Sequence, residues 1–126
     1  MKRILVIDDD VQVRELLRLV LEQAGYDVVE AGDGKEGVDL FHREPTDLVI
    51  TDIIMPEKEG IETIRELQRG YPEVKIIAIS GGGRLSAEDC LESAECFGVH
   101  LTLAKPFERE ELLDAVQDVL GVPATG

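Results

Sequence analysis

Apolar residues follow two alternating spacings along the chain, one typical of buried strands and one typical of amphipathic helices. Short apolar runs predict five strands, at residues 3–8, 26–31, 47–52, 74–80 and 99–104. Apolar positions three and four residues apart predict five helices. Their apolar positions fall within residues 13–24, 33–43, 61–67, 90–97 and 112–120, and the third helix ends before Pro72. Strict alternation of strands with helices favours an α/β fold, with a parallel sheet covered by helices on both faces.

The ends of these predicted elements carry residues suited to ending them. Asp10 stands before the first helix, where its carboxylate can accept hydrogen bonds from first-turn amides. Gly25 follows that helix and suits a left-handed C-terminal cap. The second strand is the least uniformly apolar, so we expect it nearer a sheet edge.

Composition and charge narrow the class of protein. The chain has 126 residues, of which 44% are hydrophobic, which fits one domain over residues 1–120 and a tail or linker start over 121–126. The net charge of −14 argues against binding to nucleic acid or anionic lipid and favours cations. The sequence contains no apolar stretch long enough for a membrane span and no signal peptide, so we expect a cytoplasmic protein. Cys90 and Cys96 lack the partners of a zinc site.

Polar residues stand at the ends of four of the five predicted strands. Asp8 ends the first strand and Asp9 follows it. Asp52 ends the third strand, Ser80 ends the fourth, and Lys105 follows the fifth. Because ligands bind at the carboxyl ends of the strands in open parallel sheets, we expect these residues to converge on one site.

The residue types in this set suit the handling of a phosphoryl group. Two carboxylates about 4 Å apart repel each other by roughly 4 kcal/mol at an effective dielectric constant near 20. We therefore expect that one carboxyl group takes up a proton or that a cation binds among them. Carboxylate oxygens with a backbone carbonyl and waters form a typical Mg²⁺ site. Lys105 adds a positive charge and Ser80 a hydroxyl donor at the same edge. Each feature alone is common in turns and caps, so the prediction rests on the combination.

Four motifs resemble the receiver domain of two-component response regulators, the CheY-like superfamily. They are ILVIDDD at residues 4–10, DIIMP at residues 52–56 with Gly60, Ser80-Gly81, and Lys105-Pro106-Phe107. The resemblance extends over residues 2–120. It implies a flavodoxin-like three-layer sandwich whose five-stranded parallel sheet has the order 2-1-3-4-5, with five helices.

The resemblance also implies a role for each matching residue. Asp52 would be the nucleophile that accepts a phosphoryl group from a sensor histidine kinase or a histidine phosphotransfer protein. Mg²⁺ (or Mn²⁺) would be held by Asp8, Asp9, Asp52 and the backbone carbonyl of Ile54, while Ser80 and Lys105 would contact the phosphate. Such a domain is a signalling switch that catalyses only its own phosphorylation and dephosphorylation. It would be a monomer or a weak homodimer with an unknown downstream partner.

Two departures from the receiver pattern concern signal output. Receivers commonly carry an aromatic residue three positions before the lysine, where this chain has Thr102. The segment after Ser80 is a few residues longer than usual and begins with Gly81, Gly82 and Gly83, which predicts a mobile loop. We expect Ser80 to move toward the phosphate and carry this loop, changing the surface of the fourth helix and fifth strand.

Other functions fit parts of the pattern. The glycine run could form a phosphate cradle, but it lacks the Gly-Lys-Ser/Thr ending of that motif. A flavin-binding protein of similar topology would need a Ser/Thr/Gly-rich loop after the first strand, where this chain has acids. A phosphatase with a nucleophilic aspartate would need an acid two residues after Asp52 and a substrate cap. A receiver that serves only as an unphosphorylated docking platform also remains open.

Overall fold

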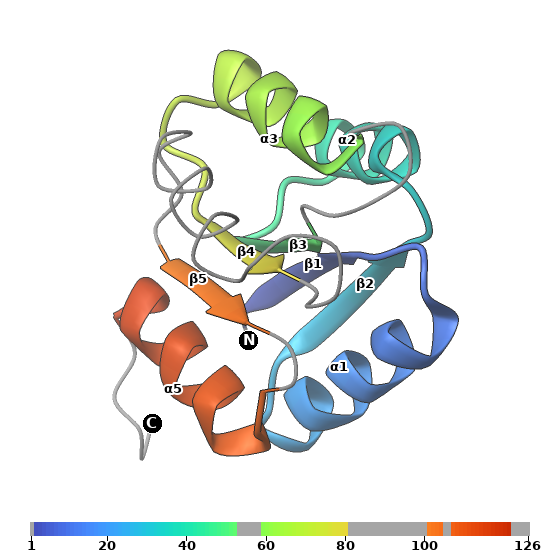
Figure 1. The fold of residues 1–126 in the computed structure, drawn as a ribbon. Coiled ribbons are helices and arrows are strands. Elements are labelled where there is room, and N and C mark those ends of the chain that lie inside the picture. Colours follow the sequence, from blue (N-terminus) through green and yellow to red (C-terminus); the bar gives the residue numbers. More distant parts are fainter. Residues whose placement is uncertain (1, 53–58, 81–100, 105–106, 122–126) are drawn as a thin grey trace.

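Five parallel strands form the central sheet of the molecule, and helices lie on both of its faces (Figure 1). The computed structural model describes residues 2–52, 59–80, 101–104 and 107–121. The strands are β1 (Arg3–Ile7), β2 (Asp27–Ala31), β3 (Leu48–Asp52), β4 (Ile76–Ser80) and β5 (Leu101–Ala104). The helices are α1 (Val11–Gln23), α2 (Gly34–Arg43), α3 (Glu59–Gly70) and α5 (Arg109–Leu120). The helix predicted at residues 90–97 lies outside the described residues.

The strand order is β2-β1-β3-β4-β5, which confirms the predicted order and the edge position of the second strand. All four strand pairs are parallel, so every strand ends at the same edge of the sheet. In the central pair Ile7 lies opposite Thr51. One position further along, Asp8 follows Ile7 and Asp52 follows Thr51, so the two acids stand at the ends of neighbouring strands.

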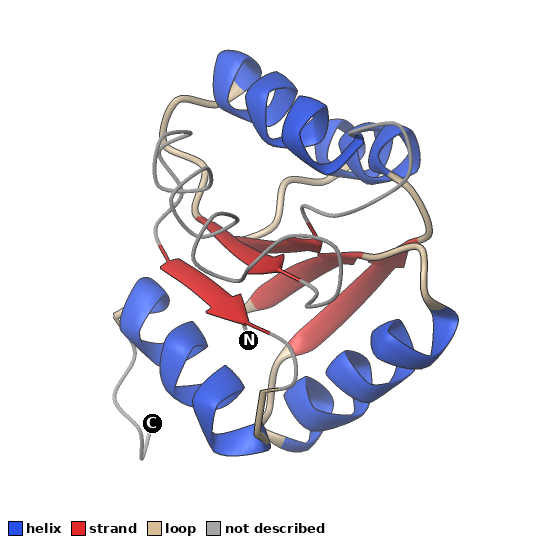
Figure 2. Cartoon of the chain, viewed as in Figure 1, coloured by secondary structure: helices blue, strands red, loops and turns tan. Residues whose placement is uncertain are grey.

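Two apolar cores, one on each face of the sheet, hold the layers together. Helices α1 and α5 cover one face, and α2 and α3 cover the other (Figure 2). Successive residues of β1 alternate between them: Ile4 and Val6 belong to the first core, Leu5 and Ile7 to the second. All four side chains are fully buried, as expected for a strand with helices on both sides.

Helix α2 lies unusually close to the end of β1. A Cβ atom added to Gly37 would lie 2.4 Å from Cδ1 of Ile7, which is a severe overlap. The absence of a side chain at Gly37 therefore lets α2 pack directly against the residue that precedes Asp8. This contact holds the end of β1 against α2.

Capping residues set the helix ends, in part as predicted. The Asp10 carboxylate accepts hydrogen bonds from the amides of Gln12 and Val13, and Gly25 has a φ of 97° after α1. Helix α5 begins at Arg109, three residues before the first of its apolar positions, Leu112. The reason is a capping box in which the Glu111 side chain accepts a hydrogen bond from the Glu108 amide.

The helices of the described ranges are too short and too polar to cross a membrane.

Candidate functional site

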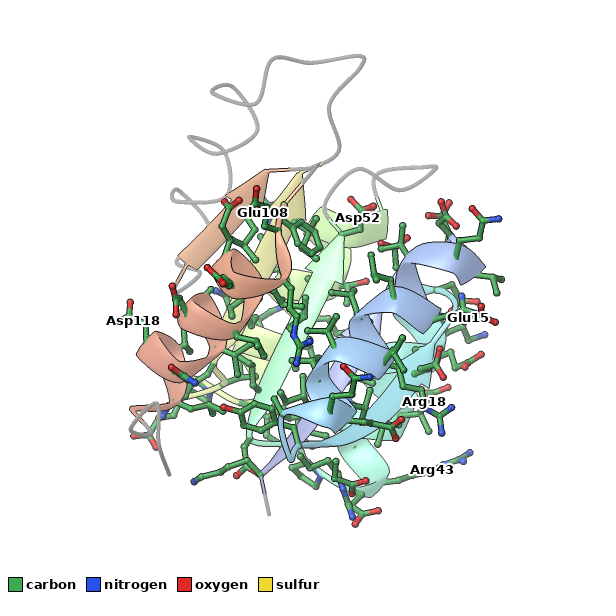
Figure 3. The ribbon with its side chains drawn as sticks, turned by 90° about the horizontal axis from the view of Figure 1, so that it is seen from below. Glu15, Arg18, Arg43, Asp52, Glu108 and Asp118 are labelled. Atoms are coloured by element: carbon green, nitrogen blue, oxygen red, sulfur yellow. The ribbon has the colours of Figure 1, made fainter. Side chains whose placement is uncertain are left out.

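Three carboxylates meet at the carboxyl edge of the sheet. Asp8 follows β1, Asp9 follows Asp8, and Asp52 is the last residue of β3. One carboxylate oxygen of each lies within 4.8 Å of the others. Figure 3 shows Asp52 at the end of the sheet, on the opposite side of the molecule from Arg43. The predicted convergence of these three acids is therefore present in the structure.

Two of the three acids are buried, which is unusual for carboxylates. Asp8 is 1% exposed and Asp52 is 4% exposed, whereas Asp9 is exposed. Charged side chains are almost never fully buried unless they are paired or ligate a metal. Two carboxylates less than 5 Å apart repel by roughly 3 kcal/mol at an effective dielectric constant of 20. Carboxylate oxygens this close together are suited to binding a cation.

Asp8 is held in place through its amide, its carboxylate and its carbonyl. Its amide donates to the Ala31 carbonyl at 3.2 Å, and its Oδ1 accepts from the Asp10 amide at 2.9 Å. Its carbonyl accepts from Nη1 of Arg14 at 2.7 Å. These contacts fix the turn between β1 and α1, which carries both Asp8 and Asp9.

Asp52 takes its place at the sheet edge from its position at the end of β3. Its neighbour Thr51 is fully buried and donates through Oγ1 to the Asp52 carbonyl at 3.3 Å. Asp52 itself lies opposite Ile79 of β4 and is the residue at which β3 ends. A side chain at the end of a central strand is held by two neighbouring strands, which gives a reacting group a fixed direction.

The remaining predicted site residues are only partly described. Ser80 ends β4 and pairs in register with Ala104, so its backbone lies at the same sheet edge. Thr102 pairs with Ala78, two positions before that edge. Ile54, Lys105 and the glycines at 81, 82 and 83 lie outside the described residues.

The donor set at this edge fits a hard divalent cation. Mg²⁺ prefers carboxylate oxygens and keeps several waters, so two or three carboxylates suffice to hold it. Asp9, the exposed member, gives access from solvent, while Asp8 and Asp52 lie beneath it. A bound cation would remove the repulsion among the three acids and leave coordination positions for a phosphate oxygen.

Arg14 also belongs to this site, although its role was not predicted from the sequence. Arg14 lies on the first turn of α1, and its guanidinium reaches back to the end of β1. A signal was present in the sequence, because a cation six residues after a strand-ending acid can fold back over a helix N-terminus. Apolar periodicity does not register such a residue.

The family comparison decides which class of protein this arrangement belongs to. The profile of the response regulator receiver domain matches residues 4–117. The chain belongs to the response regulator receiver domain family. The predicted family and the flavodoxin-like α/β fold are therefore confirmed. Receiver domains are signalling domains, and membership connects this chain to phosphorylation-dependent two-component signalling.

Relatives differ in how much of their length this receiver spans. The transcriptional regulatory protein GlrR of Escherichia coli is 36% identical over 124 residues, which are 97% of this chain but 27% of GlrR. The response regulator receiver protein CpdR of Brucella abortus is 34% identical over 120 residues, covering 95% of this chain and 98% of CpdR. Receivers similar to this one thus occur both within longer regulators and alone.

A solved structure confirms the fold. A response regulator receiver domain protein from Clostridium thermocellum superposes with a TM-score of 0.87 at 29% sequence identity. The match covers 96% of this chain and 95% of that one. The sheet and its flanking helices are therefore those of a receiver.

Proposed function

We propose that this receiver is a phosphorylation switch whose acceptor is the carboxylate of Asp52. The observation that carries the proposal is the buried Asp52 side chain at the end of β3, with the Asp8 and Asp9 carboxylates within 4.8 Å. The phosphoryl donor would be a phosphohistidine on a sensor histidine kinase or a histidine phosphotransfer protein. The downstream target is a protein or an output domain that recognises the changed surface.

In the transfer step, an Asp52 carboxylate oxygen attacks phosphorus. A new O–P bond forms as the P–N bond to the donor imidazole breaks, and the leaving imidazole takes up a proton. Hydrolysis of the resulting acyl phosphate by water returns the Asp52 carboxylate and inorganic phosphate. The domain would thus catalyse only its own phosphorylation and dephosphorylation. Such transfers depend on positioning and charge neutralisation more than on acid–base chemistry.

Asp8 and Asp9 are suited to hold Mg²⁺ and not to act as the acceptor. Oδ1 of Asp8 already accepts a hydrogen bond from the Asp10 amide, which orients the Asp8 carboxylate. Asp9 lies at the exposed side of the cluster, where a hydrated cation arrives. Mg²⁺ (or Mn²⁺) supplies the charge neutralisation that lets an anionic phosphoryl group approach three carboxylates.

Three further roles belong to this proposal. The Ile54 backbone carbonyl would complete the protein ligands of the metal. Ser80 would donate a hydrogen bond to a phosphate oxygen after transfer, and Lys105 would pair with the phosphate. Since the backbone of Ser80 lies at the edge where Asp52 ends β3, a contact through its hydroxyl is consistent with the register of β3 and β4.

Signal output is proposed to run through Ser80 and the Gly81, Gly82 and Gly83 segment, because Thr102 lacks the aromatic ring of the usual receiver relay. Phosphorylation would shift an equilibrium between two states by its differential contact with each. Hydrogen exchange at residues 81–100, with and without a phosphate mimic and Mg²⁺, tests this route. Unchanged exchange there would refute it.

We place the domain in the cytoplasm and propose that it binds neither nucleic acid nor membrane. A further part of the proposal is that the domain is a monomer or a weak homodimer. The net charge of −14 supports the absence of nucleic-acid and membrane binding, because it repels anionic polymers and lipids. Sedimentation at several protein concentrations, with and without a phosphate mimic, would test the oligomeric state.

Incubation with Mg²⁺ and acetyl phosphate, followed by intact-mass measurement, tests the acceptor function. One added phosphoryl group is expected on the parent and none on Asp52→Asn. Asp10→Asn is a matched control, since it removes a neighbouring acid yet retains an α1 cap. Absence of label on the parent, in a preparation that labels another receiver, would refute the function.

A further inference from the structure

We propose that Arg14 is a positioning residue for the acid cluster, because its guanidinium holds the backbone carbonyl of Asp8 and thereby fixes the turn that carries Asp8 and Asp9. The inference rests on the proposed function, in which these acids bind a divalent cation. Arg14 touches neither the cation nor the phosphoryl group in this role. It acts through the backbone of Asp8.

The contact between Arg14 and Asp8 is short and sheltered. Nη1 of Arg14 donates to the Asp8 carbonyl at 2.7 Å, and the Arg14 side chain is 18% exposed. A Cβ atom at Gly32 would lie 3.2 Å from the same Nη1, so the missing side chain of Gly32 leaves room for the guanidinium. The guanidinium therefore lies in a fitted space between the ends of β1 and β2.

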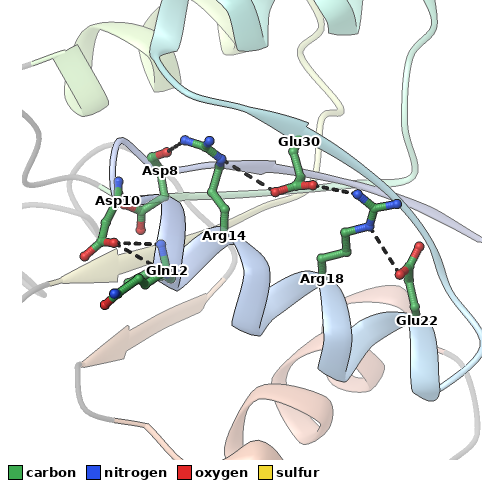
Figure 4. Close-up of polar contacts among 8 residues, drawn as sticks. Asp8, Asp10, Gln12, Arg14, Arg18, Glu22 and Glu30 are labelled. Atoms are coloured by element: carbon green, nitrogen blue, oxygen red, sulfur yellow. Dashed lines mark hydrogen bonds and ion pairs between the residues drawn. The ribbon is translucent and has the colours of Figure 1, made fainter.

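Arg14 adds a side-chain bond to the backbone and capping bonds that hold Asp8. The Asp8 amide is tied to β2 through Ala31, and the Asp8 carboxylate is tied to α1 through the Asp10 amide. Only the carbonyl bond of Asp8, among these contacts, comes from a side chain (Figure 4). Because this carbonyl belongs to the peptide that joins Asp8 to Asp9, holding it sets the orientation of both residues.

Glu30 anchors the guanidinium from the other side. Its Oε1 lies 3.6 Å from Nε of Arg14, too far for a hydrogen bond, while its Oε2 accepts from Nη1 of Arg18 at 2.9 Å. Nε of Arg14 is buried and has no hydrogen-bond partner among the described residues. Glu30 thus shares its charge between two arginines and holds Arg14 electrostatically, without fixing it through a second hydrogen bond.

Two physical effects of Arg14 on cation binding oppose each other. Its positive charge repels an incoming cation, whereas its bond to the Asp8 carbonyl pre-orients two ligands. The Glu30 carboxylate, which Arg14 shares with Arg18, offsets part of that charge. Residues that orient metal ligands typically change metal affinity by about 10- to 100-fold when mutated. We therefore expect the orienting effect to dominate.

A titration with Mn²⁺, monitored by the electron paramagnetic resonance signal of the free ion, tests the positioning role of Arg14 directly. The site is defined as the binding that Asp9→Asn abolishes. Arg14→Met should weaken this binding about tenfold, the low end for orienting residues, because Arg14 acts through backbone. Arg14→Lys keeps the charge but loses the guanidinium geometry and should also weaken it.

Arg18→Met is the matched control. Arg18 lies one turn further along α1 and shares Glu30, but its side chain is 52% exposed and it bonds Glu22 and Glu30. Its removal should leave Mn²⁺ affinity within about twofold of the parent, as expected for an exposed ion pair.

A second readout does not require metal. In the metal-free protein, the Asp9 and Asp10 amides should exchange hydrogen faster in both Arg14 variants than in the parent and in Arg18→Met. A merely structural loss of stability would raise exchange throughout α1 and β1 instead.

Several outcomes would overturn the proposal. Parent-like Mn²⁺ affinity in both Arg14 variants would do so, and tighter binding by Arg14→Met would show that its charge outweighs its orienting bond. Failure of both variants to fold would assign Arg14 a structural role only. If the parent shows no Asp9-dependent binding while the amide effect persists, the metal site of the proposed function fails and the positioning of the turn does not.

Discussion

Asp8 and Asp52 stand side by side because β1 and β3 pair in a register that sets Ile7 opposite Thr51. Each acid follows its paired residue by one position, and each is almost fully buried. Two charges that would avoid one another in an unconstrained chain are thereby held together by the apolar strands beneath them. The fold imposes repulsion at this edge, and the proposed cation would relieve it.

The metal-free protein should be destabilised by this repulsion. We predict that Asp8→Asn raises the free energy of unfolding of the metal-free protein by about 1–3 kcal/mol, the scale of one close carboxylate pair. The asparagine oxygen can still accept from the Asp10 amide, so the local turn is preserved. Thermal unfolding in a chelator measures the effect.

Addition of Mg²⁺ should reverse the order of the two proteins. Saturating Mg²⁺ should stabilise the parent through preferential binding to the folded state, and should stabilise Asp8→Asn much less. Asp10→Asn serves as the control and should respond to Mg²⁺ like the parent. A metal-free Asp8→Asn protein less stable than the parent would contradict the repulsion argument.

Close packing of α2 on β1 should make Gly37 intolerant of any side chain. Gly37→Ala would place a Cβ 2.4 Å from Cδ1 of the buried Ile7, so either Ile7 or α2 must shift. Overpacking of this kind costs about 1–3 kcal/mol. Urea unfolding measures the loss.

Gly70 provides the matched comparison for that substitution. A Cβ at Gly70 would lie 3.8 Å from Cε1 of His42, an ordinary contact. Gly70→Ala, at the end of α3, should therefore change stability by less than about 1 kcal/mol. Equal losses at Gly37 and Gly70 would show that the approach of α2 to β1 is not the cause.

Alkaline pH should weaken the fold through Tyr26. Burial raises the pKa of the Tyr26 phenol above its ordinary value of 10.0. The unfolded phenol therefore ionises first, and the stability due to the neutral buried phenol is complete below pH 10 and decreases as pH rises through the folded-state pKa.

Tyr26→Phe isolates this contribution. The parent and Tyr26→Phe should differ little in how stability depends on pH up to about pH 9, and the parent should lose stability more steeply above pH 10. Urea unfolding at a series of pH values measures the slopes. Identical slopes above pH 10 would mean that Tyr26 ionises equally in both states.

The strand ends were predictable because they follow from a simple rule. A parallel sheet buried on both faces requires apolar strands, so the first acid after an apolar run marks the point where the chain leaves the core. This rule places Asp8 and Asp52 at one edge from the sequence alone. The order of the strands was predicted only from the family resemblance, because apolar runs locate the strands but do not determine which strands pair.

Other features depend on polar contacts that the spacing of apolar residues does not predict. The start of α5 at Arg109 depends on reciprocal bonds between Glu108 and Glu111, which are polar and fall outside the apolar pattern. The reach of Arg14 to the Asp8 carbonyl depends on how α1 crosses the end of β2. Such contacts are decided by the packing of whole elements.

Borohydride mapping of the phosphorylated protein tests the central claim most directly. Reduction of an acyl phosphate releases phosphate and converts the aspartate that carried it to homoserine, which peptide mass spectrometry can locate. After treatment with acetyl phosphate and Mg²⁺, we predict homoserine at position 52 and at neither position 8 nor position 9. Homoserine at Asp8 or Asp9 with Asp52 unchanged, or phosphate found only on a hydroxyl side chain, would contradict the account.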